Sequence, residues 1–401
     1  MPEAVIVATA RTPIGRAGKG SLKDMRPDDL SALVIKTVLE QTPGLDTADI
    51  EDVLWGCGQP AGESGHNIAR VAALLAGLDD TPGVTVNRYC SSSLMTIRMA
   101  AHAIAAGDGD VFVAGGVETI SRNMAVGQLA DGPKNPLFAE AEARTAKRAE
   151  GGAPTWEPPA GLPDIYIAMG QTAENVAQYE NVSREIQDEF AVLSQNRAEE
   201  NLNSGYWEAE ITPVETPDGI VTKDDGIRPG TTLEKVSGLG PVFRPDGTVT
   251  AGNACPLNDG AAAVVVMSDT KAKALGLTPL ARIVSSAATG LNPEIMGMGP
   301  VEASRKALAR AGMSIDDIDL VEINEAFAAQ VIPSAAQLGI EWDKLNTRGG
   351  SIALGHPFGM TGARIMTTLI HNLTESDATF GLETMCVGGG QGMAMIVERL
   401  N

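Results

Sequence analysis

Residues 45–53 (LDTADIEDV) and residues 313–321 (MSIDDIDLV) share one pattern, a short acidic turn that leads into an apolar segment. Each copy follows a stretch with helical periodicity, at residues 29–40 before the first copy and 302–311 before the second. Two copies of one helix–turn–strand unit indicate an internal duplication. We therefore predict that the chain contains two similar α/β halves.

The offset between the two copies relates other parts of the chain as well. Ile318 matches Ile50, an offset of 268 residues, and the same offset carries Cys90 to position 358, beside His356. A predicted helix begins just after each of these points. A duplicated unit explains this correspondence better than chance does.

Around the two copies, short β-branched runs alternate with alanine-rich helical stretches. Leu94, Ile97, Ala101 and Ile104 recur at helical spacing, for example. This alternation is typical of layered α/β folds. Apolar strands are predicted at residues 4–9, 110–114, 261–268, 282–285, 320–323, 379–386 and 393–398.

Residues 121–250 interrupt the alternation. They contain the loop-like run EGGAPTWEPP at 150–159 and charged helical stretches such as 183–200. Long excursions of this kind usually carry binding surfaces. The predicted parts of the chain are a first half at 1–120 plus 251–275, an inserted loop domain at 121–250, and a second half at 276–401.

Composition and charge restrict the possible partners. The chain has 401 residues and a net charge of −21, and its 43% hydrophobic content is ordinary for a globular protein. A nucleic-acid-binding protein needs a concentrated basic surface, and no basic run is present, so no nucleic-acid partner is expected. An anionic substrate would need a few basic residues gathered locally against this acidic background.

The sequence also gives a prediction for the compartment. Its start resembles no targeting peptide, and its longest apolar runs, such as 261–267, are far shorter than a membrane span. The four cysteines form no CxxC pair, and no cluster of metal ligands is recognisable. We therefore expect a cytoplasmic protein with no membrane partner and no metal.

Cys90 is the first candidate catalytic residue, within VNRYCSSSL at 86–94. A strand-like pair of residues precedes it and an alanine-rich helix follows, which places the thiol at a helix N-terminus. The free N–H groups and the helix dipole there stabilise a thiolate. A lone cysteine is more often an inert buried residue, so this pattern favours a nucleophile without deciding the question.

His356 is the second candidate, within GGSIALGHPFGMTG at 349–362. Histidine suits a base that accepts a proton near neutral pH, and Pro357 fixes the backbone next to it. A glycine-rich turn before a helix can instead cradle phosphate, but the lysine of a P-loop is absent here. An ordinary loop histidine remains an equal alternative on this evidence alone.

Two further segments carry polar groups at the ends of predicted strands. Cys386 lies in TMCVGGGQG at 384–392, where three glycines let backbone N–H groups approach a ligand, as in an oxyanion hole. The plainer reading of these glycines is a tight turn between two strands, and we expect that reading to hold as well. Asn324 begins NEAFA at 324–328, where a helix N-cap is the commoner role for asparagine.

Taken together, these segments resemble the thiolase family. VNRYCSSSL, NEAFA, GGSIALGHPFGMTGAR and CVGGGQG occur in the order and at the separations found in thiolases. The stretches TARTPIG, NIARVAALLAG, AGGVETISR, MGQTAENVA and TAGNACPLNDGAAAVV extend the resemblance from end to end. It implies a five-layered αβαβα thiolase fold made of two duplicated halves with an inserted loop domain, and a homodimer or homotetramer.

The resemblance implies a role for each candidate residue. Cys90 is the nucleophile that an acyl-CoA acylates, His356 takes the thiol proton, and Cys386 exchanges a proton with the α-carbon of a second acyl-CoA. Asn324 holds a water at one oxyanion, and the N–H groups of Cys90 and Gly388 hold the other. The implied activity is CoA-dependent thiolysis of 3-ketoacyl-CoA or the reverse condensation.

Coenzyme A is then a substrate, and no cofactor is expected. By resemblance, the inserted domain supplies its pocket, with Arg228 near the nucleotide and Met169, Cys255 and Phe327 near the acyl-pantetheine part. Three more basic residues could meet phosphates, although a solvated helix face is the commoner explanation for them. These are Arg144, Lys147 and Arg148.

Departures from the usual thiolase pattern concern the pocket. Cys255-Pro256 stands where relatives often carry Ser-Gly, Ala168 where histidine is frequent, and Phe358 where a smaller residue is common. Acyl-chain preference therefore stays open, whereas the reaction class does not. Two rivals also remain. One is a ketoacyl-synthase-like condensing enzyme, which Cys386 argues against, and the other is a thiolase-like protein that binds CoA without catalysis.

Overall fold

The computed structural model describes residues 2–125 and 133–401. Its main sheet joins the two halves of the chain, and its strands lie in the order β10-β11-β12-β9-β1-β8-β5-β3-β4, with β2 paired to β8. The strands of the second half are β9 (Ala281–Gly290), β10 (Leu320–Ile323), β11 (Phe380–Val387) and β12 (Gln391–Arg399). Those of the first half are β1 (Ala4–Arg11), β2 (Gly15–Arg16), β3 (Asp52–Gly56), β4 (Gly83–Val86), β5 (Val111–Thr119) and β8 (Asn258–Ser268).

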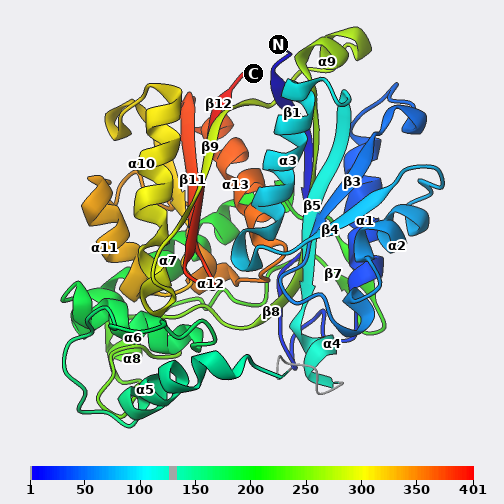
Figure 1. Ribbon diagram of the computed structural model, residues 1–401. Coiled ribbons are helices and arrows are strands. Elements are labelled where there is room, and N and C mark those ends of the chain that lie inside the picture. The colour runs from blue at the N-terminus through cyan, green and yellow to red at the C-terminus, as the bar shows by residue number, and fades with distance from the viewer. Residues whose placement is uncertain (1, 126–132) are drawn as a thin grey trace.

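The two halves of this sheet diverge, and helices fill the space between them. Only Val5–Arg282 and Ile6–Ala281 pair across the junction of β1 and β9. Helices α3 (Ser92–Ala106) and α13 (Thr361–Glu375) lie between the two groups of strands (Figure 1). Helices α1 (Pro27–Glu40) and α2 (Ile68–Leu75) cover the outer face of the first half, and α10 (Gly299–Ala311) and α11 (Ala328–Leu338) cover that of the second. The five layers are therefore α, β, α, β and α.

Side-chain alternation along the strands explains why each sheet is covered on both faces. Strand β8 is completely buried, and its alternate residues enter different hydrophobic cores. Val264 and Val266 pack in the central core with Leu94 of α3 and Met366 of α13. Their neighbour Val265 packs in the outer core with α1 and α2. Strands that are apolar on both faces require a helix layer on each side.

The predicted duplication is visible in the order of elements. Helix α1, a 3-10 turn (Thr47–Asp49) and β3 in the first half correspond to α10, a 3-10 turn (Ile315–Asp317) and β10 in the second. Strand β3 pairs in parallel with β5, just as β10 pairs in parallel with β11. The predicted α/β class and the two similar halves are confirmed.

Two strands continue five residues past their predicted ends. Strand β9 continues to Gly290 because β12 pairs along its whole length, which local composition does not reveal. Strand β5 continues through Gly115 and Gly116 to Thr119. Glycine is needed at position 116 because a Cβ there would lie 2.2 Å from the carbonyl oxygen of Gly359. What looks like a strand breaker is a site of close backbone approach.

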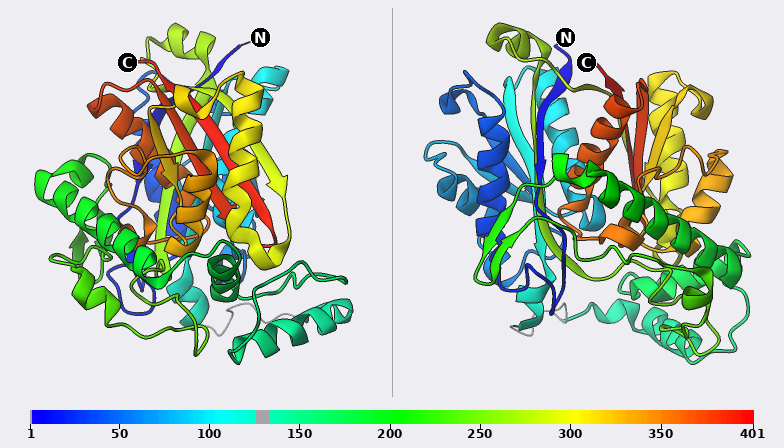
Figure 2. Two further views of the ribbon diagram at one scale, coloured as in Figure 1. Left: turned by 90° about the vertical axis from the view of Figure 1, so that its left-hand side faces the viewer. Right: turned by 180° about the vertical axis from the view of Figure 1, so that it is seen from behind.

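The excursion between β5 and β8 lies at the end of the layers opposite the two termini (Figure 2). Its elements are α4 (Ile120–Ala125), α5 (Ala139–Ala149), α6 (Met169–Tyr179), α7 (Arg184–Ser204), the hairpin β6 (Val214–Thr216) and β7 (Gly219–Val221), and α8 (Leu233–Ser237). Two short helices complete the fold, α9 (Asp269–Leu275) and α12 (Ser351–Leu354). No helix among the described residues is both long enough and apolar enough to span a membrane.

Candidate functional site

Cys90 lies in the turn between β4 and α3, as the sequence predicts. It is the middle residue of a 3-10 turn (Tyr89–Ser91) that runs directly into α3. Tyr89, just before it, has φ 42°, a left-handed conformation that is uncommon for a bulky residue. Ser92 holds this turn, because its Oγ donates to the Tyr89 carbonyl at 2.7 Å and accepts the Arg88 N–H at 2.9 Å. The strained backbone therefore fixes where the thiol points.

The electrostatics of Cys90 differ from the sequence-based expectation. The N–H groups of Gly388 and of Cys90 itself point at the sulfur and favour the thiolate. Burial outweighs them and raises the thiol pKa to about 11. Cys90 is 8% exposed, so little water solvates a charge there. In the resting site Cys90 is a neutral thiol with two hydrogen-bond donors already aimed at its sulfur.

His356 is held by the first half of the chain although it belongs to the second. Its backbone N–H donates to Asn258 Oδ1 at 2.9 Å. Gly355, with φ 119°, brings the loop so close that a Cβ would lie 2.6 Å from the Asn258 side chain. Glu118 accepts the N–H of Gly359 at 3.0 Å on the other side of the histidine. The ring is therefore fixed on both sides.

The hydrogen bonds of His356 identify its tautomer. Thr361 Oγ1 lies 2.7 Å from His356 Nδ1 and 2.7 Å from the carbonyl oxygen of Pro357. A carbonyl can only accept, so Thr361 donates its proton to Pro357 and accepts from the Nδ1–H. Nε2 then carries the free lone pair. Burial, reinforced by the charge of Arg364, lowers the pKa of His356 to about 3, so the ring is neutral.

Asn324 follows β10 and turns its side chain to the histidine. Its Nδ2 lies 3.3 Å from His356 Nε2, and its Oδ1 accepts from Ser351 Oγ at 2.6 Å. The alternative role as a helix N-cap is wrong, because α11 begins only at Ala328 and Phe327 occupies the cap position. Asn324 is 1% exposed. Its amide is therefore a buried donor at the site.

Cys386 lies near the end of β11, with no exposure to solvent. Burial raises its thiol pKa well above the usual value, and the nearby sulfurs of Cys90 and Cys255 reinforce the rise. The Gln330 side-chain amide, 3.2 Å from the sulfur, is satisfied when its nitrogen donates to the Asn324 carbonyl and its oxygen accepts from the Val331 N–H. That orientation turns the amide nitrogen toward Cys386, where it would stabilise a thiolate.

The glycines after Cys386 lie in a tight turn beside Cys90. They form the turn between β11 and β12, and Gly389 and Gly390 both have φ 76°. A Cβ at Gly390 would lie 2.3 Å from the carbonyl oxygen of Leu291. The same turn directs the Gly388 N–H at Cys90. The turn between β11 and β12 therefore also supplies the candidate oxyanion donor, the N–H of Gly388.

Two adjoining cavities connect the site with the surface. The inner cavity, of about 310 Å³, is lined by Cys90, His356, Met169 and Phe327. The outer cavity, of about 340 Å³, is lined by Arg228 and other residues of the excursion. Four residues line both cavities, which places them at a common neck. They are Phe243, Ala254, Cys255 and Leu257.

Some residues at this passage escaped the sequence reading. Arg16 and Lys19 line the outer cavity together with Arg228. Burial lowers the pKa of Arg228, and the positive charge of Arg16 adds to this effect. They follow the first strand in the sequence and gave no local signal of a pocket. By contrast, Arg144 and Arg148 on α5 bind protein groups, the carbonyl of Leu162 and the side chains of α6. Lys147 lies on the same helix and lines neither cavity.

All four cysteines of the chain are unpaired thiols. Within residues 2–125 and 133–401, no group of three or more histidine, cysteine, aspartate or glutamate side chains is arranged to hold a metal ion.

Known proteins share this architecture. The thiolase N-terminal domain matches residues 4–270 and the thiolase C-terminal domain matches residues 277–399. The chain is 47% identical to a 3-ketoacyl-CoA thiolase of Shewanella frigidimarina over the full length of both proteins. It is 45% identical to a 3-oxoadipyl-CoA/3-oxo-5,6-dehydrosuberyl-CoA thiolase of Escherichia coli, again over the full length of both.

A solved structure agrees with these relatives. The crystal structure of the acetyl-CoA acetyltransferase of Bacillus anthracis superimposes with a TM-score of 0.84 at 39% identity, covering 100% of this chain and 99% of that one. The duplicated five-layered fold and the two matched domains lead to one conclusion. The chain belongs to the thiolase family.

Proposed function

We propose that this protein is an acyl-CoA C-acyltransferase that cleaves 3-ketoacyl-CoA with CoA and catalyses the reverse condensation through an acyl-Cys90 intermediate. The observation that carries this proposal is the arrangement of four residues. Cys90 and His356 line the inner cavity, Asn324 Nδ2 lies 3.3 Å from His356 Nε2, and the Cys386 thiol lies close enough to Cys90 for the two to interact electrostatically. A nucleophile, a neutral base and a second thiol are all needed when a thioester exchanges carriers and a carbon acid exchanges a proton.

In the first step, which we call the carbon–carbon step, Cys90 attacks the 3-keto carbon of the substrate. Both Cys90 and His356 are neutral beforehand, so the thiol proton passes to His356 Nε2 while the sulfur attacks. The bond between C2 and C3 then breaks and leaves an acyl group on Cys90. Cys386 gives its proton to C2 of the departing enolate, which becomes acetyl-CoA. Asn324 and His356 support the enolate oxygen.

Before the second step, the acyl-exchange step, His356 passes its proton to the Cys386 thiolate and is neutral again. The thiol of CoA then gives its proton to His356 and attacks acyl-Cys90; the bond between the acyl carbon and the Cys90 sulfur breaks, Cys90 recovers the proton from His356, and acyl-CoA leaves. The oxyanion of this step would lie near the acylated sulfur, where the N–H groups of Cys90 and Gly388 point. Donors that are oriented before the reaction stabilise such charge at little reorganisation cost. Condensation uses the same groups in reverse order.

CoA would enter through the two cavities as a substrate, and no separate cofactor is part of the proposal. We assign residues 121–250 to an inserted domain that supplies much of the outer cavity, between a first half at 1–120 plus 251–275 and a second half at 276–401. Arg228, Arg16 and Lys19 would meet the phosphates of CoA, while Cys255, Met169 and Phe327 would contact the pantetheine or acyl part.

The inner cavity indicates which acyl groups fit. Apart from Cys90, Cys255 and His356, its lining carries no polar side chain, and among the described residues no lysine or arginine lines it. A carboxylate at the end of the acyl chain would be desolvated there without a partner. We therefore expect thiolysis of straight-chain 3-ketoacyl-CoA esters, with kcat/KM at least about tenfold lower for 3-oxoadipyl-CoA than for an uncharged chain of equal length.

Coupled measurement of CoA consumption and acetyl-CoA formation across such a series tests both the function and this preference. Equal kcat/KM for the charged and uncharged chains would contradict the predicted preference alone. No cleavage of any 3-ketoacyl-CoA would overturn the proposed function.

Replacing Arg228 with alanine is expected to raise the KM for CoA about three- to tenfold with kcat unchanged, because an exposed charge contact with a phosphate is worth about 1 kcal/mol. The increase should shrink at high salt, which screens such contacts. The matched control is Arg305→Ala, because Arg305 is an exposed arginine on α10 that pairs with Glu302. Equal KM values for the two variants would remove Arg228 from the CoA site.

We also propose that the protein forms a homodimer or homotetramer and works in the cytoplasm. Strand β4 is an edge strand of the main sheet, Val84 on it is 37% exposed, and Leu74 and Leu75 on α2 are exposed as well. Apolar side chains beside an unpaired strand edge favour association with another chain. Sedimentation velocity would give the number of subunits.

A further inference from the structure

A chain of hydrogen bonds connects the buried Arg364 to the catalytic histidine. Arg364 on α13 donates from Nη2 to Ser351 Oγ at 3.0 Å. Ser351 Oγ in turn donates to Asn324 Oδ1 at 2.6 Å, and Asn324 Nδ2 lies 3.3 Å from His356 Nε2. Every member is at most 1% exposed. This hydrogen-bond network therefore connects the positive charge of Arg364 to His356 through buried groups only.

The chemistry of its members fixes the direction of every bond. A guanidinium can only donate, so the oxygen of Ser351 accepts from Arg364. The Ser351 proton is satisfied by Asn324 Oδ1, and the reverse orientation of the amide would leave this buried proton without an acceptor among the described residues. The carboxamide of Asn324 then has one possible orientation, with its nitrogen toward His356. This agrees with the free lone pair that Thr361 and Pro357 impose on Nε2. The hydrogen bonds at Arg364 and those at His356 thus agree on the same orientation of the Asn324 amide.

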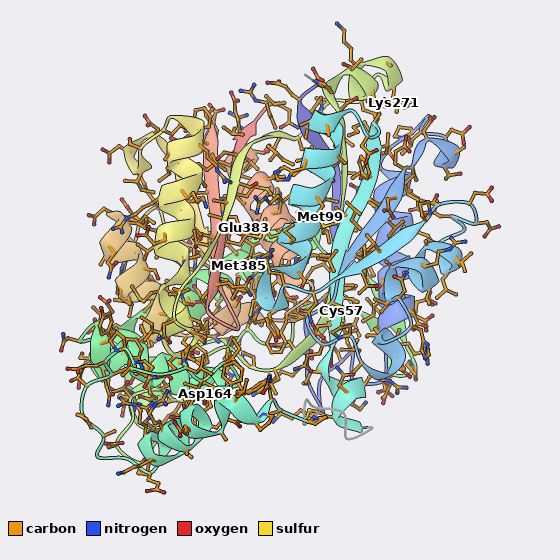
Figure 3. The ribbon with its side chains drawn as sticks, viewed as in Figure 1. Cys57, Met99, Asp164, Lys271, Glu383 and Met385 are labelled. Atoms are coloured by element: carbon orange, nitrogen blue, oxygen red, sulfur yellow. The ribbon has the colours of Figure 1, made fainter. Side chains whose placement is uncertain are left out.

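Arg364 has few other ways to be satisfied. Among the described residues its guanidinium makes one hydrogen bond, the one to Ser351, and its Nε and Nη1 have no partner there. The carboxyl groups that act on its charge are those of Glu322, Glu210 and Glu383. Glu322 and Glu383 are register partners on β10 and β11, and Figure 3 shows Glu383 in the interior of the protein. Burial raises the pKa of Glu322 to about 8 and that of Glu383 well above its usual value. Glu322 and Glu383 are therefore protonated, while Glu210, whose pKa is lowered, is already paired with Arg11 at 2.9 Å. The hydrogen bond of Arg364 goes to Ser351.

We propose that Arg364 and Ser351 are positioning residues, which hold and polarise the Asn324 carboxamide so that its N–H supports the enolate oxygen of the carbon–carbon step. This inference rests on the proposed function. It also distinguishes the two steps, because the oxyanion of the acyl-exchange step is held by the N–H groups of Cys90 and Gly388 instead. Loss of this hydrogen-bond network should therefore slow the carbon–carbon step and leave the acyl-exchange step unchanged.

The test is Ser351→Ala, which removes the one side-chain donor that Asn324 Oδ1 has among the described residues and lets the amide turn over. We expect kcat for thiolysis to fall about ten- to a hundredfold, the range typical of lost outer-shell hydrogen bonds, with KM within about threefold of wild type. Exchange of labelled CoA with acetyl-CoA, which reports the acyl-exchange step alone, should change less than about threefold.

Three further variants make the result specific. Ser351→Thr keeps the hydroxyl and should recover most of the lost thiolysis rate, and Arg364→Lys keeps the charge but not the planar donor and should give an intermediate loss. Thr367→Ala removes a buried hydroxyl on α13, whose one bond among the described residues is to Ala363 of the same helix, and should leave both reactions unchanged. A folded Ser351→Ala protein that loses both reactions equally, or neither, would overturn the positioning role. Wild-type protein without exchange activity would instead overturn the proposed function.

Discussion

Replacing Cys90 with alanine is expected to lower thiolysis by at least about 10⁴-fold, the scale of loss when a covalent nucleophile is removed. No other cysteine can substitute for it. Cys386 has no exposed surface, and neither it nor Cys255 has the pair of N–H groups that point at Cys90. Loss of the enolate absorbance of Mg²⁺–acetoacetyl-CoA on addition of CoA measures the rate. Intact mass after incubation with acetyl-CoA should show an acetyl adduct on wild type and none on Cys90→Ala.

Cys57→Ala provides the matched control. Cys57 is also a buried free thiol, but it packs in the outer core of the first half and lines neither cavity. This variant should still acquire the acetyl adduct. An adduct on Cys90→Ala, or turnover by it near the wild-type rate, would show that the nucleophile has been assigned to the wrong residue.

Replacing Cys386 with alanine should separate the two steps. We expect thiolysis and condensation to fall about 10²- to 10⁴-fold, because a positioned general acid–base contributes that much. Cys90 keeps its two N–H donors and His356, so acetylation of Cys90 and exchange of labelled CoA with acetyl-CoA should persist within about threefold. Mass spectrometry and the exchange assay on the same preparation give both quantities.

A different outcome would be equally informative. If Cys386→Ala lost the acetyl adduct as well, Cys386 would be needed for acylation and its assignment to the carbon–carbon step would be wrong. Gln330→Ala is a useful companion, because its amide faces the Cys386 sulfur and does not line the cavity. A smaller loss of rate, confined to the carbon–carbon step, would show that Gln330 acts through Cys386.

Local sequence patterns predicted much of the fold. Residues 261–267 of β8 form an unbroken apolar run, and a strand that is buried on both faces must lie between two helix layers. The positions of Cys90 and His356 in turns that precede helices also follow from nearby glycines and small residues. What local patterns could not supply is pairing at a distance. The end of β9 depends on β12, and the continuation of β5 past Gly116 depends on the loop at Gly359.

The same limit applies to the site. The thiolate expected from a helix N-terminus is absent in the resting protein, because burial by distant segments raises the pKa of Cys90 further than the N–H groups lower it. Asn324 looked like a helix cap because sequence shows the short polar side chain but not Ser351, which holds it. Arg16 and Lys19 meet Arg228 only after the chain has folded. Residue type was readable from sequence, whereas the environment that sets its chemistry was not.

The position of β8 has a consequence for how the protein is made. Strand β1 pairs along its length with β8, although residues 4–11 leave the ribosome long before residues 258–268. At about 5–20 residues per second, translation separates the two strands by roughly ten seconds or more. During that time the β1 side of β5 has no partner, since β8 lies between β5 and β1. The first half therefore cannot close its sheet during synthesis of the excursion, and this nascent intermediate is where chaperones would be needed.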